Sequence, residues 1–320
     1  MMYSYAVEQY DRLCELLSGR WQVETFLDDD PTGELRDKLA LADAIVSPRF
    51  EIGLPTAPRL GFVQSPVAGH DRIDFSALPA DCQVANVFEH EVGVSEHALL
   101  AMLEWQIRLR AIEDRFRAGS WQDGVSALGP THGELMGKTI GVIGVGHIAR
   151  AIAVRAAPFG TRLIGVTRTP KPTPGFEWVR DMKGLHEFLA QCDFVVVACP
   201  LSPETKDLIA AAELASCKST AVIMNFARGP VVNEDALYNA LQSKRIGGAV
   251  IDVWYNNPPR PGEDVAPSKH SFDTLDNVIM TPHSSSWSEG LLPRRWAVIA
   301  ENLENFADGK PLRNLVRRPA

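Results

Sequence analysis

A glycine-rich segment in the middle of the chain has the spacing that binds a phosphate. Gly144, Gly146 and Ala149 form a GxGxxA pattern between a β-branched run and an amphipathic stretch. In this pattern the first glycine makes a tight turn, the second lets the backbone approach a pyrophosphate, and the third position packs the helix on the strand. The N–H groups from Gly146 through His147 to Ile148 and the helix dipole then attract the phosphates. The pattern predicts a dinucleotide-binding site.

The residues after the next strand-like run indicate which dinucleotide binds. Chains that bind NAD carry Asp or Glu about twenty residues after the glycines, where it accepts hydrogen bonds from the ribose 2′-OH. Here the run ends in Thr167, Arg168 and Thr169, followed by Lys171. No carboxylate repels a 2′-phosphate, and the guanidinium of Arg168 can pair with one. These residues favour NADP, with NAD as the alternative and a solvated surface arginine as the structural explanation.

Apolar runs alternate with amphipathic stretches from residue 139 onward. The strand-like runs are Thr139–Val145, Arg162–Thr167, Phe194–Ala198, Ala221–Asn225, Ala249–Trp254 and Val278–Thr281. The helical stretches between them are Ile148–Ala157, Leu185–Cys192, Asp207–Ala215 and Asn233–Ser243. Continuous apolar strands with helices between them predict a parallel sheet covered on both faces.

The first ninety or so residues repeat this alternation more weakly. We expect strands over Trp21–Leu27, Ala44–Ser47 and Leu60–Gln64, and a helix over Gly33–Leu41. Two longer helices are also predicted. One over Glu96–Ala118 would bridge two lobes, and one over Pro293–Gly309 would pack back on the first lobe.

Composition and charge exclude several classes of protein. The chain has 320 residues, 45% of them hydrophobic, which is enough for two packed domains. Its net charge of −8 argues against nucleic-acid binding. The five cysteines are scattered without CxxC pairing, which predicts reduced thiols. Neither a signal peptide nor an apolar run of membrane-spanning length is visible, so we expect a cytoplasmic protein without membrane contact.

Four further motifs follow the glycine pattern along the chain. They are Val-Ala-Cys199-Pro200-Leu-Ser-Pro-Glu-Thr, Asn225-Phe-Ala-Arg228-Gly-Pro-Val-Val-Asn-Glu-Asp-Ala-Leu, Asp252-Val-Trp and Thr-Pro-His283. These motifs resemble those of the D-isomer-specific 2-hydroxyacid dehydrogenase family, with its phosphoglycerate and glyoxylate–hydroxypyruvate reductase-like members. In this order and spacing they are more specific than the glycine pattern alone. The resemblance implies an NAD(P)-dependent dehydrogenase that transfers a hydride between NADP(H) and a small 2-keto or 2-hydroxy acid.

The resemblance also implies an architecture. Family members have an α/β fold of two Rossmann-like lobes with doubly wound parallel sheets and the active site in the cleft between them. The implied division is a flavodoxin-like substrate-binding domain of residues 1–95 plus 290–320 and a dinucleotide-binding Rossmann domain of residues 96–289. The family commonly dimerises through its cofactor lobes, so we expect a homodimer with the Glu96–Ala118 helix as a candidate contact.

Two residues match the family's catalytic pair. Arg228 corresponds to the substrate-binding arginine, whose guanidinium can hold a carboxylate as a two-pronged fork while polarising a neighbouring carbonyl. His283 corresponds to the acid/base histidine, which protonates the carbonyl oxygen as the hydride arrives.

The remaining site residues are implied in the same way. In the first lobe the backbone amides of Ala68 and Gly69 would bind the substrate carboxylate, beside His70, which is equally an ordinary turn residue. Contacts around the nicotinamide and its ribose would come from Cys199, Pro200, Phe226, Ala227, Asp252 and Ser285.

Asn257 departs from the family pattern, because it stands where the family has a glutamate that stabilises the imidazolium. An amide can orient His283 but supplies no charge, so we expect keto-acid reduction to be favoured at lower pH than in glutamate-bearing relatives, and Asn257→Glu to shift the acidic limb upward. Alternatively, Glu89, Glu91 or Glu263 reaches the histidine. An amide at this position is also typical of the formate dehydrogenase branch.

The segment before the long helix departs as well. His90 is expected to contact the substrate, although a metal site with Glu91 and His97 is the alternative. These residues do not form an HExxH pattern, and the family uses no metal, so we predict none. Two other functions stay open, which are direct hydride abstraction from a formate-like substrate and a dinucleotide-sensing protein without efficient turnover.

Overall fold

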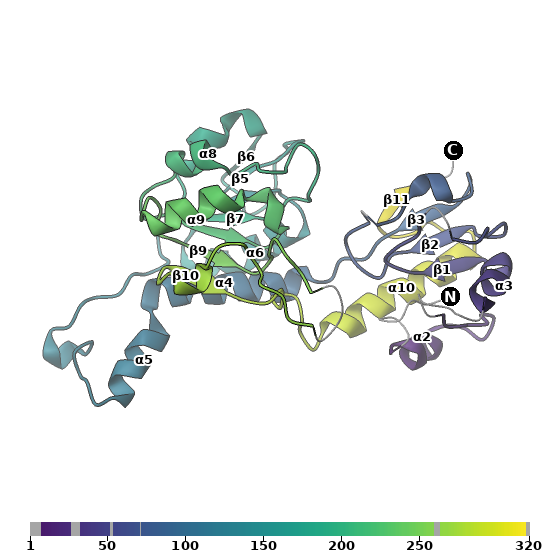
Figure 1. Cartoon of the computed structure of the whole chain (residues 1–320), viewed down its shortest axis with the longest axis horizontal. Helices are drawn as coiled ribbons and strands as arrows, with labels where there is room; N and C mark the ends of the chain where they lie inside the picture. The colour runs from purple at the N-terminus through teal and green to yellow at the C-terminus, as the bar shows by residue number, and fades with distance from the viewer. Residues whose placement is uncertain (1–7, 27–32, 52–53, 71, 259–262, 318–320) are drawn as a thin grey trace. The chain divides into compact units, whose positions relative to one another are not determined.

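The chain forms two compact α/β units (Figure 1). The computed structural model describes residues 8–26, 33–51, 54–70, 72–258 and 263–317. Unit 1 comprises residues 1–89 together with 288–320, and unit 2 comprises residues 90–287. Each unit has its own sheet, and the predicted α/β class is confirmed.

Unit 2 is built on a seven-stranded sheet in which every strand pair is parallel. The strand order is β10-β9-β8-β7-β4-β5-β6. The strands are β4 (Thr139–Ile143), β5 (Arg162–Val166), β6 (Trp178–Arg180), β7 (Phe194–Val197), β8 (Val222–Asn225), β9 (Gly248–Ile251) and β10 (Val278–Met280). The order reverses between β4 and β7, and in sheets of this kind ligands bind outside the carboxyl ends of the strands at that point.

Helices cover both faces of this sheet. They are α4 (Glu91–Ile107), α6 (His147–Ala156), α7 (Leu185–Leu189), α8 (Ala211–Ser216) and α9 (Glu234–Gln242). On one face Met102 of α4 and Ile152 of α6 pack against Val142 of β4. On the other face Phe188 and Leu237 pack against the opposite side of the same strands. The predicted strands and helices of this unit are therefore present, with bounds that differ by one to four residues.

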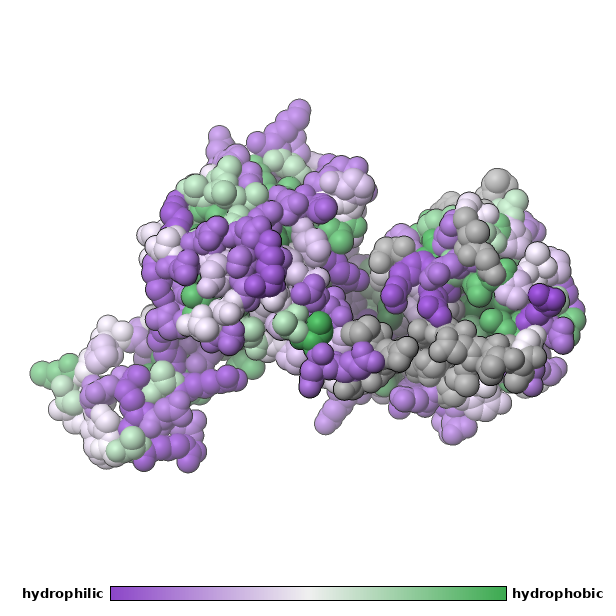
Figure 2. All heavy atoms as spheres, viewed as in Figure 1, coloured by the Kyte–Doolittle hydropathy of each residue, from purple (hydrophilic) through white to green (hydrophobic). Residues whose placement is uncertain are grey.

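The predicted helix over Glu96–Ala118 is wrong as a single element. Arg108 adopts the left-handed conformation, with φ of 58°, and its amide donates to the carbonyl of Glu104, which ends α4. A second helix, α5 (Leu109–Arg117), then begins and buries none of its residues. It and the segment that follows extend away from the sheet (Figure 1). Hydrophobic residues lie among hydrophilic ones on this projection (Figure 2).

Unit 1 has a smaller, four-stranded sheet in the order β1-β2-β3-β11. Three parallel strands, β1 (Ala44–Val46), β2 (Phe62–Gln64) and β3 (Gln83–Ala85), are followed by β11 (Leu315–Arg317), which runs antiparallel to β3. The helices are α2 (Tyr10–Leu16), α3 (Glu34–Leu41) and α10 (Leu291–Ala307). The sheet is thus parallel except at the edge formed by β11.

The expected strand over Trp21–Leu27 is not formed by residues 21–26, and Leu27 lies outside the described residues. Trp21 and Val23 instead pack against the apolar cluster beside α10. Their alternation therefore reflects burial against this cluster, and of residues 21–26 only Thr25 takes part in a β-bridge. The strands β3 and β11 and the helix α2 were not predicted, nor was β6 in unit 2.

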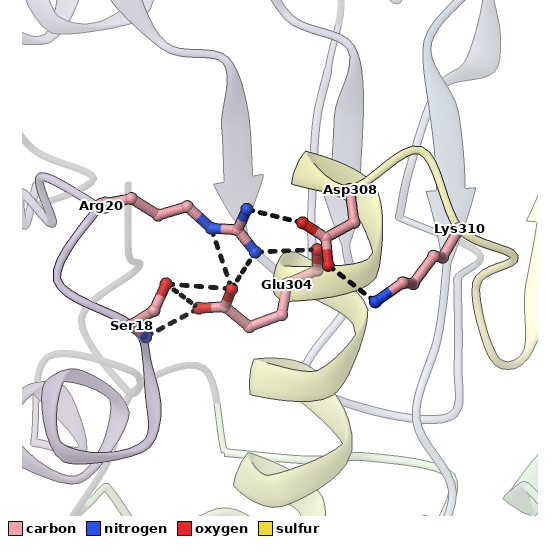
Figure 3. Close-up of polar contacts among 5 residues, drawn as sticks. All are labelled: Ser18, Arg20, Glu304, Asp308 and Lys310. Atoms are coloured by element: carbon pink, nitrogen blue, oxygen red, sulfur yellow. Dashed lines mark hydrogen bonds and ion pairs between the residues drawn. The ribbon is translucent and has the colours of Figure 1, made fainter.

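A polar network fixes the start of that segment to the end of α10 (Figure 3). The guanidinium of Arg20 binds the carboxylates of Glu304 and Asp308, and the amide of Ser18 donates to Glu304 over 2.7 Å. Lys310 adds an ion pair with Asp308 at 2.9 Å. The first and last parts of the chain are therefore joined within one unit.

Candidate active site

The glycine loop lies at the switch point of the large sheet. Gly144 follows β4 and has φ of +95°, a conformation that strongly favours glycine. A Cβ atom there would lie 2.7 Å from the amide nitrogen of Cys199, which follows β7. The absence of a side chain at Gly144 therefore allows the ends of β4 and β7 to lie close together. Burial raises the pKa of the Cys199 thiol to about 11, so this cysteine is a packing residue.

The first turn of α6 continues this loop. Gly146 is the N-cap and is exposed, as is His147, whereas Ala149 is fully buried against the sheet. The Nδ1 atom of His147 lies 4.0 Å from Oε1 of Glu91 at the start of α4. Ile148 is half-buried and packs against the apolar core of the sheet. The backbone N–H groups at the N-terminus of α6 can therefore bind an anion such as a phosphate.

The end of β5 presents the residues expected at the ribose 2′ position. Thr167 is half-buried, and its amide donates to the carbonyl of Arg180 in the neighbouring strand. Arg168 and Thr169 are exposed. A hydrogen bond from Ser202 is the main cause that lowers the pKa of Glu204, and the positive charge of Arg168 contributes. Glu204 is thus close enough to Arg168 for the two charges to interact.

The turn after β8 is held by Asn225. Its buried side-chain amide donates to the carbonyl of Arg228 over 3.0 Å, while its Oδ1 accepts from the amide of Ala227 over 3.1 Å. Phe226 and Ala227 are buried. Arg228 is exposed, and its Nη1 donates to the Ala227 carbonyl over 2.9 Å. The turn therefore fixes one N–H group of an exposed guanidinium.

Asp252, directly after β9, organises the segment that carries His283. The carboxylate is fully buried and accepts hydrogen bonds from Thr281 Oγ1 (2.6 Å), the amide of Ser284 (2.9 Å) and both the amide and hydroxyl of Ser285. Its backbone carbonyl accepts from the amide of His283 over 2.8 Å. His283 has φ of 55°, a conformation uncommon for residues other than glycine. Asp252 therefore fixes the residues before and after His283 in the chain, and with them the position of the histidine.

Three charged groups act on one another here. His283 is partly exposed at the surface of the unit. The protein atoms around its imidazole still remove some of the water, and this desolvation lowers the pKa of His283. The negative charge of Asp252 raises that pKa, and the positive charge of Arg228 lowers it. The folded unit thus brings Arg228, Asp252 and His283, which follow three different strands, to one edge of the sheet.

Asn257 is exposed, and among the described residues no hydrogen bond joins its side chain to His283. Its expected role in orienting the histidine stays a prediction. Among the alternative carboxylates, Glu91 lies beside His147, and Glu89, in unit 1, forms ion pairs with Arg294 and Arg313. The carboxylate that acts on His283 is Asp252.

Two histidines of the α4 region have different surroundings. His90 is half-buried at the N-cap of α4. The ring of His97 meets Phe226 edge-on, with centroids 5.8 Å apart, and burial lowers its pKa. Sequence reasoning did not place His97 at this edge, although its position two turns into a buried helix was a signal. In the described residues no three His, Cys, Asp or Glu side chains gather to hold a metal ion.

The substrate loop expected in the first lobe follows β2 in unit 1. Ala68, Gly69 and His70 are half-buried there. The side-chain amide of Asn86 donates to the Ala68 carbonyl over 2.7 Å. The ring of His70 lies edge-on to Phe75, with centroids 6.2 Å apart.

Together these features define a class of protein. A doubly wound parallel sheet with a glycine loop at its switch point binds a dinucleotide, and an arginine and a histidine on the same edge supply groups for oxidoreduction. The model of the D-isomer specific 2-hydroxyacid dehydrogenase NAD-binding domain matches residues 99–285. The chain belongs to the D-isomer specific 2-hydroxyacid dehydrogenase family, and it is an NAD(P)-dependent dehydrogenase.

Sequences and crystal structures of relatives match this chain over nearly its whole length. A glyoxylate reductase of Pyrococcus horikoshii is 34% identical, over 95% of this chain and 92% of the relative. The crystal structure of a family member from Aeromonas salmonicida superposes with a TM-score of 0.81 at 26% identity, over 99% and 97% of the two chains. The crystal structure of an NADPH-dependent glyoxylate/hydroxypyruvate reductase from Sinorhizobium meliloti, in complex with NADP and sulfate, superposes with a TM-score of 0.79 at 25% identity. The match covers 98% of this chain and 96% of that one. No helix of the described residues is long and apolar enough to cross a membrane.

Proposed function

We propose that this dehydrogenase uses NADPH to reduce a small 2-keto acid, of the size of glyoxylate or hydroxypyruvate, to the 2-hydroxy acid. The observation that carries the proposal is the meeting of Arg228, Asp252 and His283 at the edge that bears the glycine loop. The similarity to glyoxylate reductases and to an NADPH-dependent glyoxylate/hydroxypyruvate reductase supports this choice of substrate and cofactor.

When bound, the reduced nicotinamide supplies the hydride. The residues of the chain bind the substrate, polarise its carbonyl group and supply a proton. The guanidinium of Arg228 pairs with the substrate carboxylate and polarises the carbonyl. The imidazolium of His283 gives its proton to the carbonyl oxygen, so the alcohol forms without a free alkoxide. To the amides of Ala68 and Gly69 we assign binding of the substrate's acid group, and to His70 and His90 further contacts with the substrate.

We assign the cofactor to the edge of the large sheet. The diphosphate would lie on the loop from Gly144 to Ile148, where a Cβ at Gly146 would meet no atom of the chain within 4 Å and the backbone is therefore open to a ligand. The residues around the nicotinamide and its ribose would be Cys199, Pro200, Phe226, Ala227, Asp252 and Ser285. The 2′-phosphate of NADP would pair with Arg168 between the hydroxyls of Thr167 and Thr169, because no carboxylate ends β5.

The test measures oxidation of NADPH and of NADH with glyoxylate, hydroxypyruvate, pyruvate and phenylpyruvate. We expect turnover with NADPH at a kcat/KM at least about tenfold above that with NADH. Arg168→Ala is expected to raise the KM for NADPH about tenfold and to leave that for NADH unchanged, since one charge-assisted pair contributes about 1.5 kcal/mol. Lys183→Ala, an exposed cation of the same unit, is the matched control. Equal rates with both cofactors would contradict the assignment of NADP.

We further propose that the active form is a homodimer joined through the projection formed by α5 and the residues after it. Val125 (93% exposed), Leu128 (92%) and Trp121 (66%) present large apolar side chains to water on this projection, which supports an interaction site there. A second copy of the chain would cover them. Sedimentation at micromolar concentration should give twice the chain mass of 35.1 kDa, and Trp121→Glu with Leu128→Glu should give the single chain. A monomer before substitution would contradict this proposal.

A further inference from the structure

We propose that Ser65 and Asn86 are positioning residues, which aim the backbone amides of the loop Val67–His70 at the substrate carboxylate. This inference rests on the proposed function, in which that loop binds the acid group. Neither side chain need touch the substrate. Each acts on the carbonyl groups of the loop, and so determines the direction of the N–H groups on the opposite side of the same peptide planes.

Ser65 is the residue directly after β2 and is fully buried. Its hydroxyl lies 3.0 Å from the carbonyl oxygen of Val67 and 3.1 Å from that of Gly69. Its own amide donates to the carbonyl of Ala85 over 2.8 Å, so its backbone is fixed by the neighbouring strand. The hydroxyl is therefore a rigidly placed donor beneath the loop.

Asn86 is the residue directly after β3 and is 5% exposed. Its side-chain amide donates to the carbonyl of Ala68 over 2.7 Å, and its backbone amide donates to the carbonyl of Asn314 over 3.2 Å. The carbonyl of His70 accepts from the amide of Ile73 over 3.0 Å. Two adjacent strand ends thus provide donors to successive carbonyls of one loop.

The consequence for the amides follows from peptide geometry. In a trans peptide the C=O of one residue and the N–H of the next point in opposite directions. With the carbonyls of Val67, Ala68 and Gly69 turned toward Ser65 and Asn86, the amides of Ala68, Gly69 and His70 point away from them. Within the described residues these three amides have no acceptor. Successive N–H groups that point the same way form a binding site for an anion such as a carboxylate.

A purely structural role for these hydrogen bonds makes a different prediction. If Ser65 and Asn86 only stabilise unit 1, their loss should lower the melting temperature and leave the kinetics of the folded enzyme unchanged. If they position the amides, their loss should weaken binding of the acid substrate specifically. The KM for the keto acid separates the two roles, while the KM for NADPH reports on the other substrate.

The experiment compares Ser65→Ala and Asn86→Ala with Asn277→Ala in the full chain. Asn277 is a matched control because it is also buried, at 6% exposed, and donates its side-chain amide to backbone carbonyls, those of Leu241 and Gly247. We expect each of the first two variants to raise the KM for glyoxylate about fivefold, since a hydrogen bond contributes about 1 kcal/mol. The kcat and the KM for NADPH should stay within about twofold, and the control should change only the melting temperature.

The outcomes distinguish this inference from the function on which it rests. If the unsubstituted chain reduces glyoxylate and both variants keep its KM, the positioning role is overturned and the proposed function stands. If Asn277→Ala raises that KM as much as they do, the effect is general destabilisation and the inference is overturned. If the unsubstituted chain reduces no 2-keto acid, the proposed function fails and the inference fails with it.

Discussion

Replacing His283 with alanine is expected to lower kcat for 2-keto acid reduction about 10²- to 10⁴-fold, which is the range for loss of a general acid. The variant should still bind NADPH, because the glycine loop and Arg168 follow other strands. Steady-state kinetics with glyoxylate and a fluorescence titration with NADPH measure the two effects. His186→Ala, a histidine on α7 that is bonded to Ser216, is the matched control and should keep full activity. A His283→Ala variant within tenfold of the unsubstituted rate would remove the histidine from the mechanism.

The same residue determines the pH dependence. Desolvation lowers the pKa of His283 below its ordinary value of 6.5, and the charge of Arg228 adds to this. Reduction needs the protonated imidazole, so kcat/KM should be constant at low pH and should fall about tenfold per unit above a midpoint below 6.5. Oxidation of the hydroxy acid needs the neutral imidazole and should rise through the same midpoint.

Asn257→Glu tests whether position 257 contributes to this midpoint. An added carboxylate near the imidazolium would raise the pKa of His283 and move the falling limb to higher pH. An unchanged midpoint would mean that Asp252 is the carboxylate that matters.

Replacing Asp252 with asparagine is expected to have the second large effect. An amide keeps one acceptor oxygen but turns a donor toward Ser285 in place of the other, and it removes the negative charge that acts on His283. Part of the network that fixes His283 is therefore lost. We expect kcat to fall about 100-fold, because a shift of about 1 Å in a catalytic group has that effect. The free energy of unfolding should also fall by about 2–4 kcal/mol, since hydrogen bonds to a charged group are lost.

Asp193 provides the matched control for this substitution. It is another largely buried carboxylate of the same unit, but it precedes β7 and therefore lies at the opposite edge of the sheet. It accepts from the amide of Thr139 over 2.8 Å and pairs with Lys218 at 2.9 Å. Asp193→Asn should lower the melting temperature with little change in kcat. If both variants lost activity equally, the role of Asp252 would be general stability.

The large sheet could be predicted because its strands are continuous apolar runs. Phe194–Val197 and Val222–Asn225 are buried on both faces, so composition alone marks them. Arg228 and His283 were identified by their resemblance to family motifs, and parallel strands explain why they meet, because the residues that follow such strands lie at one edge of the sheet. The glycine loop was predictable for the same reason, since Gly144 satisfies a backbone conformation rather than a distant contact.

Other features depend on contacts that the sequence does not encode locally. Arg108 ends α4 although it is a good helix former, because its left-handed backbone cannot be inferred from residue type. The strand β3 has three residues and forms only because β2 and β11 lie on either side. The network around Asp252 was missed in the same way, since Thr281 and Ser285 are about thirty residues away and are ordinary hydroxyl residues.

The return of α10 to the first unit has a consequence for how the chain is made. On a ribosome, residues 1–89 emerge first but lack the helix and the strand β11 against which Phe62 and Ala85 pack. At 5–20 residues per second, synthesis of residues 90–287 takes roughly 10–40 s, during which unit 2 can complete its own sheet. The half-built first unit must wait with its apolar faces uncovered, so its assembly is the step at which a nascent chain would need a chaperone.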